Sequence, residues 1–375
     1  MSDRLLSLKT RLKELVAIDT TSARSNGPLV ERIERELAPA GFRCERQSYR
    51  DPEGVEKLNL IAHRGPAGLP ELALVGHTDC VPFDPSWREA LLLTEKDGRL
   101  YGRGSCDTKA YIACAIEAAL RTPTTRPLVL IFTADEEIGL VGAKQLVQAG
   151  KGKAKRAIVG EPTSLTPVRA HKGYCLAEIE VFGKEGHSAH PQTGASAIFR
   201  AARLIQKIET YADGEMRQAT DALFSPPFPT LNVGVISGGR AKNVIAGSCR
   251  MTFEWRPLPG QPLEGALRRV ETLIGECRQG DPEFKAEVRF LRGDPGVDTP
   301  ASSEIVSFLA SESGSPAGTV PFATEAPQLT QLGAQAVVFG PGDIRVAHQS
   351  HEFVPIEEFL RCEEILAKAI ARFCA

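Results

Sequence analysis

Short apolar runs alternate with helical patterns between residues 58 and 161. The runs LNLIAH, ELALVGH, PLVLIFTA and RAIVGEP have the length and composition of buried strands, and the segments near 108–121 and 139–149 have helical spacing. Such alternation is typical of α/β domains in which helices cover a largely parallel sheet. It therefore predicts a ligand site at the carboxyl ends of the strands.

The pattern changes near Lys172. Residues 173–292 predict strands and helices in the order β-α-β-β-α-β, which is the order of a ferredoxin-like α+β unit. Helical and strand patterns of the first kind then return, and the last of them is an amphipathic segment that begins near Pro355. We therefore expect an α/β catalytic domain formed by residues 1–172 and 293–375, interrupted by an inserted lobe at 173–292.

Composition and charge exclude several kinds of partner. The 375 residues carry a net charge of −2, without the basic excess that would attract nucleic acid. Leu5, Leu8, Leu12 and Leu15 recur at helical spacing among charged residues, which predicts an amphipathic helix at the N-terminus rather than a signal peptide. No apolar stretch approaches the roughly 20 residues that cross a membrane. We therefore expect a cytoplasmic protein without nucleic-acid or membrane partners.

The nine cysteines indicate neither a disulfide framework nor a thiolate zinc site. They are spread singly along the chain and form no C-x-x-C pair. Most are therefore expected to be small buried hydrophobic residues. Any bound metal would need ligands from histidines and carboxylates.

Acidic residues and a histidine follow the predicted strands. His77 comes at the end of one strand, Glu136 and Glu137 follow the next, and Glu161 follows a third. Because the carboxyl ends of parallel strands meet at one edge of a sheet, we expect these side chains to lie close together. Two adjacent carboxylates repel each other unless a cation neutralises them. One can then be a metal ligand and its neighbour a general base, which is the combination that metal-assisted hydrolysis requires.

Three further positions each allow two interpretations. Asp79 points to the same side as His77 on an extended segment and can orient its imidazole, although a structural His–Asp pair is the more common arrangement. Asp107, in GRGSCDTKA, can cap the following helix or bridge two cations. In VAHQSHE, His348 and His351 compete for any ligand role.

Taken together, these motifs resemble those of the family of co-catalytic zinc peptidases and deacylases, which includes aminoacylase and succinyl-diaminopimelate desuccinylase. The resemblance covers essentially the whole chain and implies a zinc-peptidase-like catalytic domain with an inserted ferredoxin-like dimerisation lobe. It also implies two divalent metal ions, with zinc preferred and cobalt or manganese as alternatives. The residues that carry it are GHTDCVP at 76–82, GRGSCDTKA at 102–110, TADEEIGLVGA at 133–143, GEPT at 160–163, GHSAHP at 186–191, EWRPLPG at 254–260 and AHQSHE at 347–352.

The resemblance assigns roles to single residues. Asp79 would orient a metal ligand, and Glu136 would take a proton from a metal-bridging water and pass it to the leaving amine. The family aligns its last ligand with the histidine four residues before the glutamate of AHQSHE, which favours His348 over His351. The implied ligands are His77 and Glu161 for one metal, Glu137 and His348 for the other, and Asp107 as the bridge between them.

The inserted lobe also contributes residues in this resemblance. His187, in GHSAHP, would reach from one subunit of a homodimer into the active site of its partner and stabilise the tetrahedral oxyanion. Arg256 resembles the residue that binds the carboxylate of the substrate, as an Arg fork can do in bidentate fashion, and Asn243 resembles a polar substrate contact.

Substrate and reaction class are less constrained than the ligands. FATEAPQL at 322–329 and FGPGDIRVAHQSHEF at 339–353 resemble most the family members that deacetylate N2-acetyl-L-ornithine in arginine biosynthesis. Acetylcitrulline, succinyl-diaminopimelate, another N-acyl amino acid and the substrate of a related dipeptidase remain alternatives. A different reading makes Cys106 the nucleophile of a metal-free amidase. Another is a binding module that has the fold without catalysis.

Overall fold

The computed structural model describes residues 3–375, which cluster into two compact units. The first unit runs to Arg169 and is completed by residues 299–318 and 324–375. The second unit consists of residues 170–298 and 319–323. The segment 173–292, where the sequence indicates an inserted lobe, lies inside this second unit.

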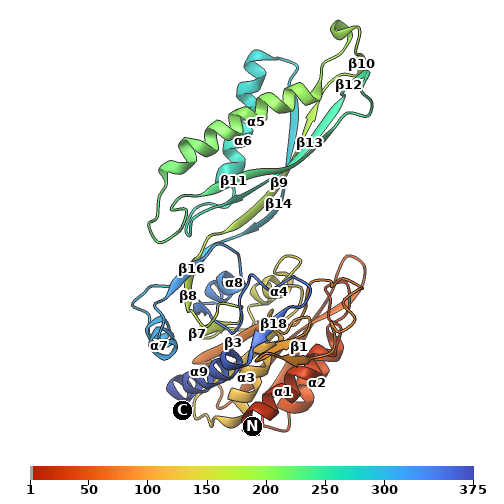
Figure 1. The fold of residues 1–375 in the computed structure, drawn as a ribbon. Coiled ribbons are helices and arrows are strands. Elements are labelled where there is room, and N and C mark those ends of the chain that lie inside the picture. Colours follow the sequence, from red (N-terminus) through yellow and green to blue (C-terminus); the bar gives the residue numbers. More distant parts are fainter. Residues whose placement is uncertain (1–2) are drawn as a thin grey trace. The chain divides into compact units, whose positions relative to one another are not determined.

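The first unit contains most of a nine-stranded sheet whose centre is parallel (Figure 1). The strand order is β1-β2-β6-β3-β7-β17-β8-β15, and β16 pairs with β8. The four central strands β6, β3, β7 and β17 run parallel to one another, so the α/β fold class is confirmed. The strand bounds are β1 (Arg43–Arg50), β2 (Glu56–Arg64), β3 (Leu72–His77), β6 (Leu128–Thr133), β7 (Arg156–Val159), β8 (Val168–His171), β15 (Val297–Asp298), β16 (Gly318–Val320) and β17 (Gln335–Val338).

Strand β2 differs from the parallel centre, because it runs antiparallel to both β1 and β6. The connections on either side of β2 are short turns and loops, at 51–55 and 65–71. A parallel neighbour needs a crossover of a dozen or more residues, whereas a short connection reverses the chain. The run LNLIAH is therefore a buried strand, as its composition indicates, but its carboxyl end does not share an edge with those of the central strands.

Helices cover both faces of this sheet. Alternate residues of β6 face opposite ways: Leu128, Leu130 and Phe132 belong to one large apolar core, while Ile131 lies on the other side near Leu146. Contacts and Figure 1 place α1, α3 and α9 side by side on the first face. The helices of that face are α1 (Asp3–Val16), α2 (Gly27–Leu37), α3 (Lys109–Arg121), α7 (Glu304–Ser313) and α9 (Ile356–Cys374), and those of the other are α4 (Val141–Ala149) and α8 (Ala326–Gln331).

Helix α9 shows how the apolar pattern sets the packing. Phe359, Ile365 and Ile370 are buried against the sheet side, whereas Lys368 and Arg372 form ion pairs with acidic residues of α7. The C-terminal helix is thus amphipathic, as the sequence indicates. Within residues 3–375, no helix combines the length and apolar character that a membrane span requires. A separate three-stranded sheet consists of β4 (Thr94–Lys96), β5 (Arg99–Tyr101) and β18 (Phe353–Pro355). Helix α9 follows β18 directly in the chain.

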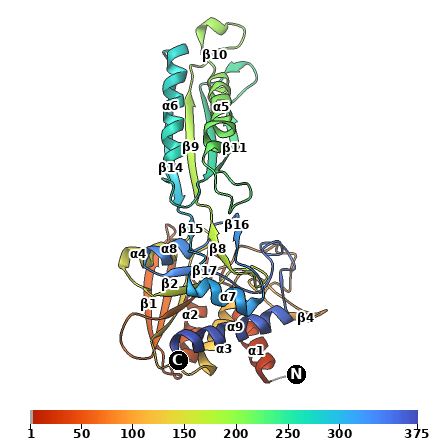
Figure 2. The ribbon, with the colours of Figure 1, turned by 90° about the vertical axis from the view of Figure 1, so that its left-hand side faces the viewer.

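The second unit has the predicted ferredoxin-like topology. Its sheet has the order β11-β13-β9-β14, in which every neighbouring pair is antiparallel. Helices α5 and α6 lie on the same face of this sheet (Figure 2), over the buried side chains that alternate along β9 and β13. The elements are β9 (Tyr174–Phe182), α5 (Ala197–Asp213), β11 (Thr230–Gly238), β13 (Ser248–Arg256), α6 (Gly265–Gly280), β14 (Lys285–Asp294), the short pair β10 (Gly186–His187) and β12 (Val244–Ile245), and single 3₁₀ turns at Pro191–Thr193 and Glu215–Gln218.

Candidate metal centre

The carboxyl ends of three parallel strands bring the candidate side chains together. His77 is the last residue of β3, Glu136 and Glu137 come shortly after β6, and Glu161 comes shortly after β7. The register aligns these ends, because His77 lies opposite the last residue of β6 and Val75 lies opposite the last residue of β7. A glycine-rich loop before α3 adds Asp107 to the same region.

Five of these side chains form two groups that could each hold a metal ion. His77, Asp107 and Glu161 make the first group, and Asp107, Glu137 and His348 make the second, with the donor atoms of each group within 4.8 Å of one another. Asp107 Oδ1 lies 2.9 Å from His77 Nε2, and Asp107 Oδ2 lies 3.2 Å from His348 Nε2. The two oxygens of Asp107 therefore face different histidines, which is the geometry of a carboxylate that bridges two cations.

The charge balance of this cluster also fits cations. Burial and the neighbouring carboxylate of Asp107 raise the pKa of Glu161 well above its usual range, and the same two causes raise the pKa of Glu137. Burial likewise raises the pKa of the Glu136 carboxyl well above normal. So many acids in one buried place are costly as anions unless positive charge compensates them. Imidazole and carboxylate donors suit zinc and similar divalent ions.

Asp79 fixes the backbone around these candidate ligands. Its carboxylate accepts hydrogen bonds from Ser22 Oγ at 2.9 Å, from the N–H of Glu136 at 3.0 Å and from the N–H of Glu137 at 3.2 Å. His77 Nδ1 lies 3.0 Å from the backbone oxygen of Asp79 and 3.7 Å from its carboxylate. Asp79 thus contacts the imidazole as the sequence suggests, with the closer contact through its main chain, and it also aims the two following acids.

Asp135, which directly precedes Glu136, has hydrogen-bond and ion-pair partners that the sequence did not suggest. Asp135 adopts a positive φ of 55°, a conformation that few residues other than glycine take. Its carboxylate accepts a hydrogen bond from Tyr49 OH at 2.9 Å and forms an ion pair with the buried ammonium of Lys57 at 3.0 Å. These partners hold the backbone turn that directs Glu136 and Glu137 away from the strand. No local motif marks Tyr49 or Lys57, because both lie on strands distant in sequence.

Comparison with known proteins identifies the family. Residues 73–372 match the model of the peptidase family M20/M25/M40, which is most of the chain. The sequence is 58% identical over 377 residues to a protein of Myxococcus xanthus named acetylornithine deacetylase, and the match covers 100% of this chain and 99% of the relative. The chain belongs to the peptidase family M20/M25/M40.

Solved structures of other proteins share the fold of this chain. A tripeptidase from Staphylococcus aureus superposes with a TM-score of 0.78 at 21% identity, covering 98% of this chain and 99% of the other. A dinuclear metal-binding peptidase of the M20 family from Bacillus subtilis superposes with a TM-score of 0.70 at 14% identity, covering 99% of both chains. The parallel-centred sheet with its ferredoxin-like insertion is therefore a fold that this chain shares with these structures.

The structure separates the two histidines of VAHQSHE. His348 Nε2 lies 3.1 Å from Glu137 Oε2, and hydrogen bonds with Asp107 and Glu137 raise the pKa of its imidazole to about 10. The ring of His351 instead lies 5.7 Å from that of Trp87, and His351 belongs to neither donor group. His348 is thus the histidine whose ring reaches the cluster.

The surroundings of Cys106 argue against the hypothesis that its thiol is a catalytic nucleophile. The side chain is 1% exposed, and its Sγ donates to the backbone oxygen of Asp343 at 3.6 Å. Burial raises the pKa of the Cys106 thiol well above its usual range. Reactive cysteines have lowered pKa values, because the thiolate is the nucleophile. Cys106 therefore has the character of a structural thiol.

The candidate residues of the second unit lie at different places within it. His187 of β10 pairs with Val244 of β12, and the N–H of Ser188 donates to the backbone oxygen of Asn243 at 3.1 Å, so His187 and Asn243 are neighbours. Arg256 is the last residue of β13, which begins shortly after Asn243. The 9 residues of β13 span about 25 Å, so Arg256 lies at the other end of this strand from Asn243. His187 and Asn243 are exposed.

Arg256 has partners of its own in the second unit. Its Nη1 donates to the backbone oxygen of Pro321 at 3.0 Å, and its guanidinium lies 5.0 Å from the ring centre of Tyr174. With Lys172 it lines a pocket of about 280 Å³. Two cationic side chains at one pocket fit an anionic group such as a carboxylate.

Proposed function

We propose that this chain is a metal-dependent deacetylase that hydrolyses N2-acetyl-L-ornithine to L-ornithine and acetate, as a cytoplasmic step of arginine biosynthesis. The observation that carries the proposal is the position of Asp107 between two donor groups, with the additional acid Glu136 directly before Glu137 in the chain. The choice of substrate is supported by the 58% identity to the acetylornithine deacetylase of Myxococcus xanthus.

Two divalent ions fit the donor set, and we propose zinc for both sites. His77 and Glu161 would hold one ion, Glu137 and His348 the other, and Asp107 would bridge them. Bound there, the ions would polarise the acetyl carbonyl and lower the pKa of water toward neutrality. Cobalt and manganese also accept these ligands, so metal analysis and reconstitution with each ion decide between them.

Glu136 would act as the proton carrier. Its carboxyl belongs to neither donor group, and burial raises its pKa well above normal, which makes the carboxylate a stronger proton acceptor. It would accept a proton from the attacking water as the water oxygen bonds to the acetyl carbon. It would then donate that proton to the amine nitrogen as the C–N bond breaks. Hydrogen bonding of its backbone N–H to Asp79 keeps the side chain in place.

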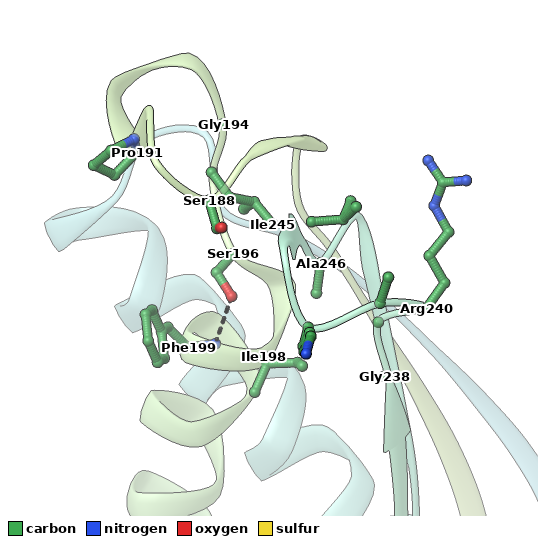
Figure 3. A pocket seen from close by; sticks show the side chains of 14 residues that line it. Ser188, Pro191, Gly194, Ser196, Ile198, Phe199, Gly238, Arg240, Ile245 and Ala246 are labelled. Carbon is green, nitrogen blue, oxygen red and sulfur yellow. Dashed lines mark hydrogen bonds between the residues drawn. The ribbon is translucent and has the colours of Figure 1, made fainter.

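We also propose that the second unit forms a homodimer that brings His187 to the active site of the partner. A pocket of about 650 Å³ lies beside the loop that starts at Ser188 (Figure 3). Ile198 and Phe199 of α5 line it and are 40% and 70% exposed, and Val235 and Ile236 of the edge strand β11 are 63% and 52% exposed. Exposed apolar side chains on one helix and the neighbouring edge strand are typical of a subunit interface.

The substrate is tested by comparing turnover of acetylornithine, acetylcitrulline and succinyl-diaminopimelate by the metal-loaded protein. We expect the highest kcat/KM with acetylornithine. The highest value with succinyl-diaminopimelate would contradict the proposed substrate while leaving the reaction class intact. Treatment with a chelator should abolish turnover, and added zinc should restore it.

The role of Glu136 is tested with Glu136→Gln. The amide cannot carry the proton, so we expect kcat to fall by about 10³-fold, within the roughly 10²- to 10⁴-fold that general acid–base catalysis contributes. Two metal ions per chain should remain bound, because Glu136 lies outside both donor groups. Loss of metal from Glu136→Gln would show that Glu136 is a ligand. Glu137→Gln is the matched comparison, since it should lose metal.

A further inference from the structure

We propose that Glu352 is a positioning residue of the metal centre: its buried carboxylate binds the backbone of the loop that carries Asp107 and ties it to the segment that carries His348. Glu352 is 1% exposed. Its Oε1 accepts the N–H groups of Cys106 at 2.8 Å and Asp107 at 2.9 Å. Its Oε2 accepts the N–H of Gly104 at 3.1 Å and Nη1 of Arg103 at 2.6 Å.

The main chain of Glu352 holds the same loop. Its backbone oxygen accepts the N–H of Gly102 at 3.1 Å and the hydroxyl of Ser105 at 3.2 Å. One residue thus makes six polar contacts to residues 102–107, two through its main chain and four through its carboxylate. So complete a set of partners explains how a carboxylate can be buried there, since converging N–H groups form an anion site and Arg103 supplies the compensating charge.

The shape of the loop depends on Gly104. Its φ is +79°, and a Cβ at this position would lie 2.8 Å from Cys80 Sγ. Only glycine takes this conformation readily, and the turn it makes lets the N–H groups on either side converge on one carboxylate. The glycine-rich character of GRGSCDTKA therefore serves the binding of Glu352.

Glu352 connects two ligand-bearing segments that are far apart in sequence. The N–H of Asp107 is fixed by Glu352 Oε1, so the backbone from which the bridging carboxylate projects has a set orientation. His348 stands four residues before Glu352, on the loop that enters β18. Both oxygens of Glu352 are occupied by the loop, so Glu352 itself is not a metal ligand. It sets the position of Asp107 relative to His348, and this part of the inference rests on the metal site proposed above.

Hydrogen–deuterium exchange of the metal-free protein tests the backbone contacts directly. The peptide covering 102–110 should exchange slowly in the wild type and faster in Glu352→Gln, because the amide group presents a donor to N–H groups that need an acceptor. This readout does not depend on the reaction catalysed. An unchanged exchange rate at 102–110 in Glu352→Gln would overturn the proposal even if the proposed function holds.

Metal affinity tests the consequence for the site. Residues that orient a ligand typically change metal affinity by about 10- to 100-fold when replaced, and we expect a weakening of this size in Glu352→Gln. KM should stay within about twofold while kcat falls, since substrate contacts are untouched. The fluorescence of Trp87 can report on the loop, because its ring centre lies 5.4 Å from the guanidinium of Arg103, which contacts Glu352. With Trp255→Phe as background, Trp87 is the remaining tryptophan of the two, and zinc titration can follow its fluorescence.

Glu358→Gln is the matched control. Glu358 Oε2 also accepts a backbone N–H, but that of Gly342, at 2.8 Å, and not one of the Asp107 loop. We expect wild-type metal affinity and wild-type exchange at 102–110 in this variant. If Glu352→Gln does not fold, Glu352→Asp keeps the charge on a shorter side chain and should show intermediate metal affinity. A lower melting temperature with wild-type metal affinity, in either Glu352 variant, would overturn the proposal and leave Glu352 a purely structural residue.

Discussion

The candidate residues of the two units differ in how the protein holds them. In the first unit, His77, Asp107 and Glu161 are at most 5% exposed, and buried carboxylates accept the backbone N–H groups of the candidate ligands Asp107 and Glu137. In the second unit, His187 is exposed, and its ring accepts a local hydrogen bond from the N–H of Ala189 at 3.1 Å and lies 5.8 Å from the ring of His190. The first set is preorganised within its own unit, whereas His187 lacks such support there.

This difference indicates which parts of the proposed reaction each unit can perform alone. Metal binding and proton transfer need fixed geometry, and the first unit supplies it through contacts that are complete within that unit. An exposed histidine on a two-residue strand can contribute to the reaction only when a further surface orders it. The contrast therefore supports a role for His187 that depends on assembly.

The largest effect that tests this comparison is expected for His187→Ala. Removing one oxyanion donor typically lowers kcat by about 10²- to 10³-fold, and we expect a loss of this size with both metals still bound. Stability should not change, because the side chain is exposed. Steady-state kinetics, metal analysis and thermal unfolding measure the three quantities.

Mixing experiments then locate the partner of His187. His187→Ala and Glu136→Gln are each nearly inactive, but a mixed dimer has one site with an intact Glu136 and an intact His187 from the other subunit. After unfolding and refolding together, we expect roughly a quarter of the wild-type activity, since half of randomly paired dimers are mixed and each holds one intact site. No recovery on mixing would show that His187 acts within its own chain or not at all.

The sequence predicted the parts of the site that follow from strand direction. His77, Glu136 and Glu161 could be placed at one edge because parallel strands end there, and their residue types already indicated metal chemistry. The ferredoxin-like order of the second unit was likewise readable, because its strands alternate in burial. The antiparallel β2 was not, since a buried run looks the same in either direction.

The supporting residues could not be predicted for a different reason. Glu352 stands inside a recognised motif, yet its partners lie about 245 residues earlier, and only the folded chain brings them together. Ser22, Tyr49 and Lys57 have no motif at all. Hydrogen bonds between distant segments depend on tertiary geometry, which neither periodicity nor spacing encodes.

A smaller effect is expected when the backbone support of the first unit is weakened at Asp79. Asp79→Asn keeps the size of the side chain but turns one acceptor oxygen into a donor that faces backbone N–H groups. We expect metal affinity to fall by about 10- to 100-fold, measured by competition with a chelating dye. Ser22→Ala is the matched control, since it removes only the donor at 2.9 Å and leaves both N–H contacts of Asp79 intact. Equal losses in the two variants would contradict the view that Asp79 acts by holding the backbone of Glu136 and Glu137.

The smallest effect concerns a buried histidine of the second unit. His171 is 0% exposed, and burial lowers the pKa of its imidazole to about 4. Its Nδ1 lies 2.8 Å from the backbone oxygen of Lys172. An unfolded histidine titrates near pH 6.5, so above that pH both states are neutral and the group has no effect on stability. Below it the unfolded chain binds a proton that the folded chain does not, and the free energy of unfolding falls as pH decreases toward 4.

His171→Asn removes this titration while keeping a nitrogen near the position of Nδ1. We expect the wild type to lose about 1 kcal/mol more than the variant for each pH unit between 6.5 and 4.5, measured by urea unfolding. The two tryptophans assign the effect, because Trp255 lies in the core of the second unit and Trp87 in the first. The difference should appear with Trp255 as reporter in a Trp87→Phe background. An equal difference with Trp87 as reporter would mean that the two units unfold as one, and that their contrast is one of local order rather than of separate stability.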